Sequence, residues 1–425
     1  MGSGMWLKLG GIALMAGVAA CGGGGGDDEE GGAGGPPAPP PAGPGWTVPL
    51  PPPAGATTGA TVDGVFRDAL VQGLDYDDGG ALAGTTGADG GFQYAQGNEV
   101  TFSIGGLTLG SLPGQPYMSP LHIVGSASNL ALRVNNRLRL LQMLDLDNNP
   151  ENGIVISEAV RAAAVNWTTP DFAVGYPEFA AAIQSIIADA NAADGVTHTL
   201  PGDAAASAHF VRTAWCTYNG LYRGGYTGGG DSGVWTMVVY GTGGLMFGGG
   251  YSRVDSEGFE LQKQAASGLS IFPDFSAGET SSGASFSGSF RTPDHINGSW
   301  SNAPDTGTFL GGRAGGSNAA IYRMSGYAFP LGTALLMNFE IDSADQITGM
   351  IIDRDFTGRA EPVTLTGTLS GTTVAASSAG NQYVVNGTFD KAAAPGSLQL
   401  NGTLRDNVKN RDVQLSGRLP GCRLN

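Results

Sequence analysis

The sequence predicts a mainly β protein: a small antiparallel β-sandwich module, a short helical bridge, and then a glycine-rich antiparallel barrel or sandwich region. First, a unit of the form apolar-x-Gly-x-apolar recurs seven times between residues 286 and 419. Second, apolar and polar residues alternate in VTFSI at 100–104, which is typical of a half-buried strand. Third, 72 of the 425 residues are Gly and only 14% are charged.

Residues 1–20 have the pattern of a secretory signal peptide. The stretch Leu9–Ala20 carries no charge and follows a single Lys8. Its twelve residues are too few to cross a hydrocarbon core as a helix, which takes about 20 residues. The motif VAAC at 18–21 resembles the lipobox of bacterial lipoproteins. That resemblance implies cleavage before Cys21 and lipidation of its thiol and new amino group, palmitate included; the alternative is an ordinary signal peptide with an incidental cysteine.

Residues 21–58 are predicted to be a disordered tether. The run GGGGGDDEEGGAGGPPAPPPAGPG lacks the apolar residues needed for a core, and it combines flexible Gly with semi-extended Pro. Gly22 follows the cysteine; among Gram-negative lipoproteins Asp at that position is associated with inner-membrane retention. The lipobox resemblance therefore implies an outer-membrane location, and several acyl chains would give stable membrane anchoring.

Residues 59–157 are predicted to form a small β module with one helix and an acidic loop. The layout T-x-x-G-x-F-x-Y-x-x-G-x-x-V-x-F-x-I-G resembles a module that follows the lipobox in proteobacterial surface lipoproteins. Leucines 138, 140, 141 and 144 form a helical stripe. The loop at 145–153 concentrates oxygen donors and opens as an EF-hand loop does, so it predicts calcium ligation or, alternatively, a solvated turn. Its candidate ligands are Asp145, Asp147, Asn149, Glu151 and Asn152.

Residues 158–213 are predicted to be a helical linker, 214–315 an antiparallel β domain and 316–425 a β-barrel domain. The linker carries apolar residues at 179, 183, 186 and 187, and we expect His209 on a helix that leads into Cys216.

In a strand the unit apolar-x-Gly-x-apolar puts two large groups and one glycine on the same face, and the glycine permits a sharp bend. The seven copies are FSGSF (286–290), INGSW (296–300), ITGMI (347–351), LTGTL (365–369), VNGTF (385–389), LNGTL (400–404) and LSGRL (415–419).

The segments NFEIDSADQITGMI, VTLTGTLSG, VVNGTFD and SLQLNGTL resemble the β-barrel domain of transferrin-binding-protein-like surface lipoproteins. The similarity covers Ile321–Asn425. It implies a barrel of about eight strands in a lipid-anchored receptor or decoy. This chain ends in LSGRLPGCRLN rather than the usual Gly-Phe-Gly-type strand, so we transfer no binding residue.

The number of cysteines predicts one disulfide. Lipidation of Cys21 would leave only Cys216 and Cys422, an even pair in an oxidising compartment. We therefore expect them to be bonded, with two unpaired buried thiols as the alternative.

Recognisable catalytic motifs are lacking in the sequence. GDSG at 230–233 is similar to the nucleophile motif of chymotrypsin-like proteases, but His209 lies too near Ser232 in sequence, so we interpret GDSG as a hairpin turn. No HExxH, CxxC or GxSxG occurs. Asp353, Asp355 and Glu361 are interpreted as solvated loop charges. We therefore expect no enzymatic activity, no catalytic residue and no cofactor other than calcium.

The net charge of −16 gives no electrostatic reason to bind nucleic acid. We expect a non-enzymatic, lipid-anchored outer-membrane protein at the cell surface, with the membrane and an unidentified protein or glycan as its partners. Two alternatives stay open: a structural envelope protein that faces the periplasm, and a hydrolase that acts on an envelope polymer.

Overall fold

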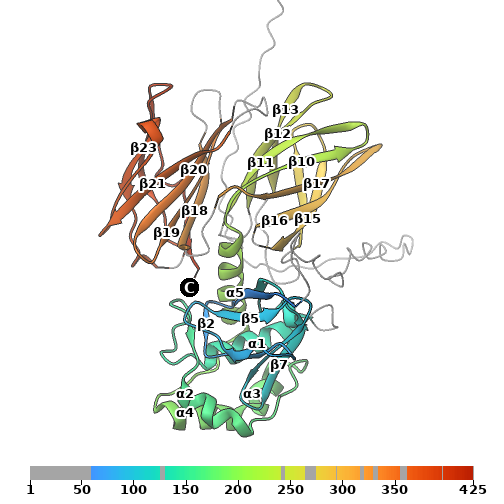
Figure 1. Cartoon of the computed structure of the whole chain (residues 1–425), viewed down its shortest axis with the longest axis vertical. Coiled ribbons are helices and arrows are strands. Elements are labelled where there is room, and N and C mark those ends of the chain that lie inside the picture. Colours follow the sequence, from blue (N-terminus) through green and yellow to red (C-terminus); the bar gives the residue numbers. More distant parts are fainter. Residues whose placement is uncertain are drawn as a thin grey trace, which may run out of the picture. The chain divides into compact units, whose positions relative to one another are not determined.

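Two antiparallel β assemblies follow a mixed α/β region in the computed structural model (Figure 1). The structure describes residues 59–124, 130–240, 245–263, 274–292, 294–315, 320–328, 334–354, 361–394 and 396–424. The predictions for the signal peptide, Cys21 and the tether lie outside these residues. The fold class predicted from the sequence, mainly β with few short helices, is confirmed.

The first region has one hydrophobic core that strands and helices share. Phe66 and Phe102 of its strands lie in the same buried cluster as Leu141 and Phe179 of its helices. The predicted boundary at residue 157 therefore does not separate a β module from a linker, because the helices after it complete the core. The strands are β1 (Thr61–Phe66), β2 (Val71–Gln72), β3 (Asp75–Asp77), β4 (Ala83–Thr85), β5 (Gly91–Ala95), β6 (Glu99–Ile104), β7 (Leu107–Pro113), β8 (Tyr117–Met118) and β9 (Ile154–Val155).

These strands form the orders β5-β1-β8 and β4-β3-β6-β7 and the pair β2-β9. The expected strand at 100–104 is the end of β6, whose Val100, Phe102 and Ile104 are buried. The module is not purely antiparallel, because β8 and β9 each return to pair in parallel with an earlier strand. The helices are α1 (Leu130–Met143), α2 (Glu158–Ala163), α3 (Tyr176–Ala182), α4 (Gln184–Asp194) and α5 (Asp203–Tyr218), with 3-10 turns at His122–Val124 and Ala164–Asn166.

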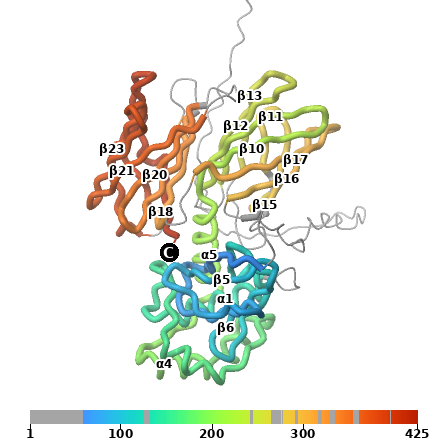
Figure 2. Tube along the Cα trace, viewed as in Figure 1, coloured from blue at the N-terminus to red at the C-terminus, as the bar shows by residue number. Residues whose placement is uncertain are grey.

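Strands β10 to β17 close into a barrel, with β10 hydrogen-bonded to β17 from Tyr222↔Arg313 to Gly228↔Gly307. Figure 2 traces the chain from α5 into β10. Only Asn219 separates the two elements. The barrel strands are β10 (Gly220–Gly228), β11 (Asp231–Val239), β12 (Met246–Ser252), β13 (Glu257–Lys263), β14 (Asp274–Thr280), β15 (Ser285–Thr292), β16 (His295–Asn302) and β17 (Asp305–Arg313).

The remaining strands form a nine-stranded antiparallel sheet in the open order β25-β24-β23-β22-β21-β20-β19-β18-β26. The fully closed barrel lies at 220–313, within the predicted antiparallel β domain. The predicted barrel region at 316–425 forms this nine-stranded sheet, whose end strand β26 also bonds back to the segment before β24, from Gly421 N to the carbonyl of Leu398 at 2.7 Å. The strands are β18 (Ala320–Ala328), β19 (Ala334–Asp342), β20 (Gln346–Arg354), β21 (Val363–Ser370), β22 (Thr373–Ser378), β23 (Tyr383–Thr388), β24 (Asn401–Asp406), β25 (Arg411–Gln414) and β26 (Gly421–Arg423), with a 3-10 turn at Ala379–Asn381.

The glycine-centred units lie on strands with one exception. The first six copies fall on or overlap strands β15, β16, β20, β21, β23 and β24. The seventh, LSGRL, is a turn after β25, and its Gly417 has φ +72°, a left-handed conformation that favours glycine. The prediction of a strand at 415–419 was therefore wrong. The same residue pattern forms a turn here, because its central glycine adopts a left-handed conformation that reverses the chain.

Inward-facing glycines of the barrel lie beneath aromatic rings of the neighbouring strands. Gly250 pairs with Phe259, and Gly298 pairs with Phe309. A Cβ added at Gly298 would be 2.4 Å from the ring of Phe309, and one at Gly250 would be 2.1 Å from the ring of Phe259. The absent side chain makes room for the ring, which covers the backbone and fills the curved interior.

Among the described residues no helix is long and apolar enough to span a membrane.

We expect Gly298→Ala to destabilise the protein by roughly 1–3 kcal/mol, because its Cβ would overlap Phe309 and the carbonyl oxygen of Ser287. Urea unfolding measures the free energy. Ser299→Ala, on the exposed outer face of the same strand, is the control and should change little. Equal stability of the two variants would contradict the role of the ring in fixing this glycine.

Candidate functional site

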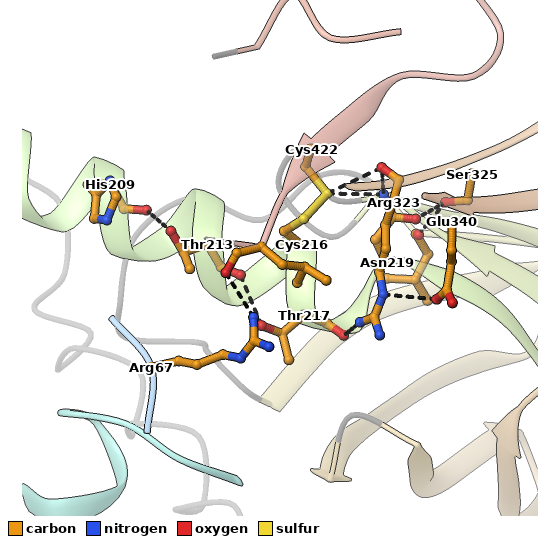
Figure 3. The surroundings of a disulfide bond; sticks show 12 residues. Arg67, His209, Thr213, Cys216, Thr217, Asn219, Arg323, Ser325, Glu340 and Cys422 are labelled. Atoms are coloured by element: carbon orange, nitrogen blue, oxygen red, sulfur yellow. Dashed lines mark hydrogen bonds and ion pairs between the residues drawn. A yellow bond between two sulfur atoms is a disulfide. The ribbon is translucent and has the colours of Figure 1, made fainter. Parts of the chain in front are cut away.

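Cys216 and Cys422 form a disulfide, which confirms the predicted pair (Figure 3). Their Cα atoms are 5.6 Å apart across a separation of 206 residues. Cys216 lies in the last turn of α5 and is fully buried, and Cys422 lies in β26. The amide nitrogen of Asn219 lies 3.4 Å from Sγ of Cys422. The bond ties the end of the helix to the edge strand of the nine-stranded sheet.

A buried charged pair lies beside the disulfide. Nε of Arg323 is 3.0 Å from Oε1 of Glu340, and both side chains are at most 6% exposed. Nη1 of Arg323 donates to the carbonyl of Thr217 at 2.5 Å (Figure 3). Burial, and secondarily the charge of Arg313, lowers the pKa of Arg323 to about 10, so the guanidinium stays charged at neutral pH. Its partners hold β18 and β19 against the end of α5.

This junction also contacts the first region. Nη1 of Arg67, just after β1, donates to the carbonyl of Leu424 at 2.8 Å. Ser325 Oγ donates to the carbonyl of Val239 at 2.7 Å, which links β18 to β11. The disulfide and its surroundings therefore have a structural role: they join the three β-containing parts of the chain at the end of α5.

The carboxylates among the candidate calcium ligands bond to groups within the chain. The Asp145 carboxylate accepts from the backbone of Asn149 and Val155, each within 3 Å. The Asp147 carboxylate accepts from Asn152 Nδ2 at 2.8 Å. Burial raises the pKa of Asp145 to about 6.

Glu151, the remaining charged candidate, bonds to α5 rather than to the loop. Its Oε1 lies 3.1 Å from Nδ1 of His209 and also pairs with Arg212. Within the ranges that the structure describes, no group of three or more His, Cys, Asp or Glu side chains is arranged to hold a metal ion. Calcium binding by the loop stays a prediction.

Beside His209 lies a fully buried carboxylate, Asp68. One of its oxygens accepts from Gln142 Nε2 at 3.0 Å, and the other has no hydrogen-bond partner among the described residues. Burial raises the pKa of Asp68 to about 6, although the nearby His209 opposes the increase. No sequence pattern indicates this group, because its burial depends on contacts with α1 and α5.

The glycine-rich stretch that contains GDSG forms the predicted hairpin turn, and Asp231 already begins β11. Gly229 and Gly230 have φ values of +56° and +80° and connect β10 to β11, as in a two-residue hairpin loop. Asp353 is not a solvated loop charge: its side chain is 11% exposed and pairs with Arg411 at 2.7 Å and with Lys409. Glu361 is exposed and pairs with Arg223, and Asp355 lies outside the described residues.

A cavity of about 180 Å³ lies inside the barrel, at the end where the hairpin loops β10–β11, β12–β13, β14–β15 and β16–β17 meet. Its wall carries inward-facing aromatic side chains from six strands. They are Tyr226, Trp235, Phe259, Phe286, Trp300 and Phe309.

The opposite end of the barrel is filled. Trp215 and Tyr218 of α5 pack with Tyr222 and Phe290 of the barrel in one buried cluster. The ring centroids of Tyr218 and Phe290 are 4.7 Å apart. The barrel is thus closed by the helix at one end and hollow at the other.

Three carboxylates lie at the hollow end: Asp231, Asp255 and Glu257. Asp231 accepts from the Tyr226 hydroxyl at 2.9 Å and from Ser252 Oγ at 2.8 Å. Burial, and then the hydrogen bond to Asp231, raises the pKa of Tyr226 well above its usual range, so its hydroxyl stays a donor. Among the described residues that line the cavity, none is Lys, Arg or His.

The cavity has no counterpart among the sites predicted from the sequence. Period-two alternation does place 257, 259 and 261 on one face of a strand. It does not show that this face and that of Phe309 enclose the same space, because that depends on closure of β10 onto β17.

Comparison with known proteins gave one structural likeness. No family model matches the chain, and no curated protein matches it. Among solved structures, the isotype 1 transferrin binding protein B from serogroup B Neisseria meningitidis is 15% identical, with a TM-score of 0.15. The match covers 45% of this chain and 51% of that chain, so this chain spans about half the length of that protein. At this TM-score the likeness carries no argument about fold or function.

Removal of the disulfide by the double change Cys216→Ser and Cys422→Ser should lower the free energy of unfolding by roughly 4–5 kcal/mol, because the bond closes a loop of more than 100 residues. Chemical denaturation measures the loss. Wild type under reducing conditions is the matched control and should behave as the double variant does. A loss below about 1 kcal/mol would show that the surrounding contacts suffice to hold the junction.

Asp68→Asn should stabilise the protein at neutral pH. A carboxyl group with a raised pKa in the folded state contributes stability that is present below about pH 4 and is lost as the pH rises through about 6. The variant should therefore gain up to about 3 kcal/mol over wild type at pH 7 and nothing at pH 4. Unfolding measured from pH 4 to 8 checks this, with exposed Glu99→Gln as the control. A wild-type advantage at pH 7 would refute it.

Proposed function

We propose that this chain is a non-enzymatic, lipid-anchored outer-membrane lipoprotein that binds a ligand at the cell surface, with the hollow end of the β10–β17 barrel as the ligand site. The observation that carries the proposal is the cavity: the chain fills one end of the barrel with α5 and leaves aromatic rings and carboxylates around unfilled space at the other. Ligand sites are concave and mainly apolar, with a few polar groups that set orientation.

The sequence supports the anchor. VAAC at 18–21 and the Gly/Pro-rich run that follows it have the pattern of a lipidated terminus and a spacer. A spacer of this kind would hold the folded part away from the membrane, where a macromolecular ligand can reach the barrel.

Proteinase treatment of intact cells tests location. We expect the wild-type chain to be digested on unbroken cells and Cys21→Ser to leave the membrane fraction. Protection until the outer membrane is opened would favour the alternative, a structural protein that faces the periplasm. Membrane retention of Cys21→Ser would refute the lipid anchor.

Pull-down from host or environmental fluid tests binding. Ala284 lines the cavity, so Ala284→Trp should fill it and reduce capture of the enriched partner. A tether-only peptide of residues 21–58 is the second control. Equal capture by wild type and Ala284→Trp would remove the cavity as the ligand site.

The alternative hydrolase has one observation in its favour. Asp231 and Asp255 both accept from the hydroxyl of Ser252, at 2.8 and 3.4 Å, so two carboxylates lie close together at the cavity. Recovery of shortened polymer fragments, rather than intact partner, from the same pull-down would favour this alternative.

A further inference from the structure

We propose that the barrel cavity binds an organic cation, specifically a quaternary ammonium group, through its aromatic wall and acidic rim. This inference rests on the proposed function, since it names the ligand class of the same site. It follows from the size of the cavity, the faces that the rings present, and the balance of hydrogen-bond donors and acceptors around it.

The cavity is of a size for one small group. Its volume is about 180 Å³, and an engineered cavity of about 150 Å³ is enough for benzene. A trimethylammonium group is of comparable size, and it is soft and apolar on its surface while carrying a full positive charge. It therefore suits a mainly aromatic wall.

The rings are arranged around the space rather than in a single stack. Trp235 and Phe309 lie edge to face at 88°, with centroids 6.0 Å apart, and Tyr226 lies edge to face with both Phe259 and Trp300. Because neighbouring rings are turned by 71–88°, their π-faces point in different directions around the cavity that they line. Such a cage attracts cations electrostatically, most strongly through Trp.

Hydrogen-bond donors of the wall are mostly used within the chain. The Tyr226 hydroxyl and Ser252 hydroxyl donate to Asp231, and Trp235 Nε1 donates to the carbonyl of Gly225 at 3.1 Å. Asn302 Nδ2 donates to the carbonyl of Ser282. The wall thus presents acceptors and π-faces in excess of free donors.

One donor differs. Trp300 Nε1 is buried with no hydrogen-bond partner among the described residues, and it lies over Gly307, where a Cβ would be 2.5 Å away. It faces the glycine of the adjacent strand, so it adds little donor capacity to the cavity.

The charge of the rim favours the same ligand. Asp231, Asp255 and Glu257 take part in none of the ion pairs found among the described residues. Three carboxylates without a countercharge would disfavour an anionic ligand and attract a cation. A neutral sugar would fit the rings and donate its hydroxyls to the carboxylates, but it would gain no charge attraction and would find few free donors for its own oxygens.

The test compares choline with 3,3-dimethylbutan-1-ol, which has the same shape with carbon in place of the charged nitrogen. Titration calorimetry with the purified full chain should show choline binding about tenfold or more tightly than the neutral analogue. Equal affinity would overturn the inference while leaving the cavity as a ligand site, and absence of choline binding would overturn it as well. Neither result depends on cell-surface location or on capture of a macromolecular partner, so the proposed function is judged separately.

Two Glu→Gln variants test which carboxylate the bound cation faces. Glu257→Gln should weaken choline binding about threefold or more and reduce its salt dependence, because Glu257 lies at the rim. Glu260→Gln removes the same charge from the same strand. Glu260 lies on the other face of β13, is exposed and does not line the cavity, so choline affinity should stay unchanged. Phosphocholine should bind more weakly than choline, since its phosphate would face the rim. Equal effects of the two Glu variants, or tighter binding of phosphocholine, would contradict the proposed orientation.

Discussion

The end of α5 is the constraint on which the rest of the structure depends. Within one helical turn the chain supplies a ring to the barrel interior with Tyr218, a sulfur to the edge strand β26 with Cys216, and a carbonyl to the buried guanidinium of Arg323 with Thr217. The next residue but one begins β10. Because a helix and a strand meet here with almost no loop, the direction of α5 sets the direction of the first barrel strand. Displacement of this turn would disturb both β assemblies at once.

The barrel shows how a chain poor in large aliphatic residues can still fill a closed interior. Small curved barrels need close backbone approach, which glycine allows, and they also need volume, which glycine lacks. Here the ring of a neighbouring strand supplies that volume, as Phe309 does over Gly298 and Phe259 over Gly250. The rings that surround the cavity at the hairpin end are among those that lie over glycines, as Phe309 and Phe259 do.

Local patterns predicted the strands, and contacts distant in sequence decided what the strands built. VTFSI and the units around Gly288 and Gly298 are strands because alternation and turn residues are local properties. The sequence predicted a barrel at 316–425, where most copies of the unit lie, whereas the strands that close fully lie at 220–313 and use glycine runs such as GGG at 248–250. Closure depends on whether the last strand reaches the first, which no local pattern encodes.

The disulfide could be predicted from the sequence and the cavity could not, for the same reason. The disulfide followed from counting, since two cysteines remained once Cys21 was set aside. The cavity joins residues as far apart as Tyr226 and Phe309, so it required the three-dimensional register. Glu151 was assigned to the acidic loop by proximity in sequence, yet its carboxylate bonds to His209 and Arg212 on α5. Asp68 was not noticed, because a single carboxylate near β1 has no pattern that reports its burial.

The separation of the two cysteines also sets an order of events as the chain emerges. Cys216 precedes its partner by 206 residues, so the barrel strands and all of the sheet strands except β26 are synthesised before the bond can form. Cys216 is fully buried in the finished fold, and Cys422 reaches it only when β26 pairs with β18. The oxidised pair therefore marks molecules in which the two β assemblies have come together, and a free thiol at Cys216 in the purified protein would mark molecules in which they have not.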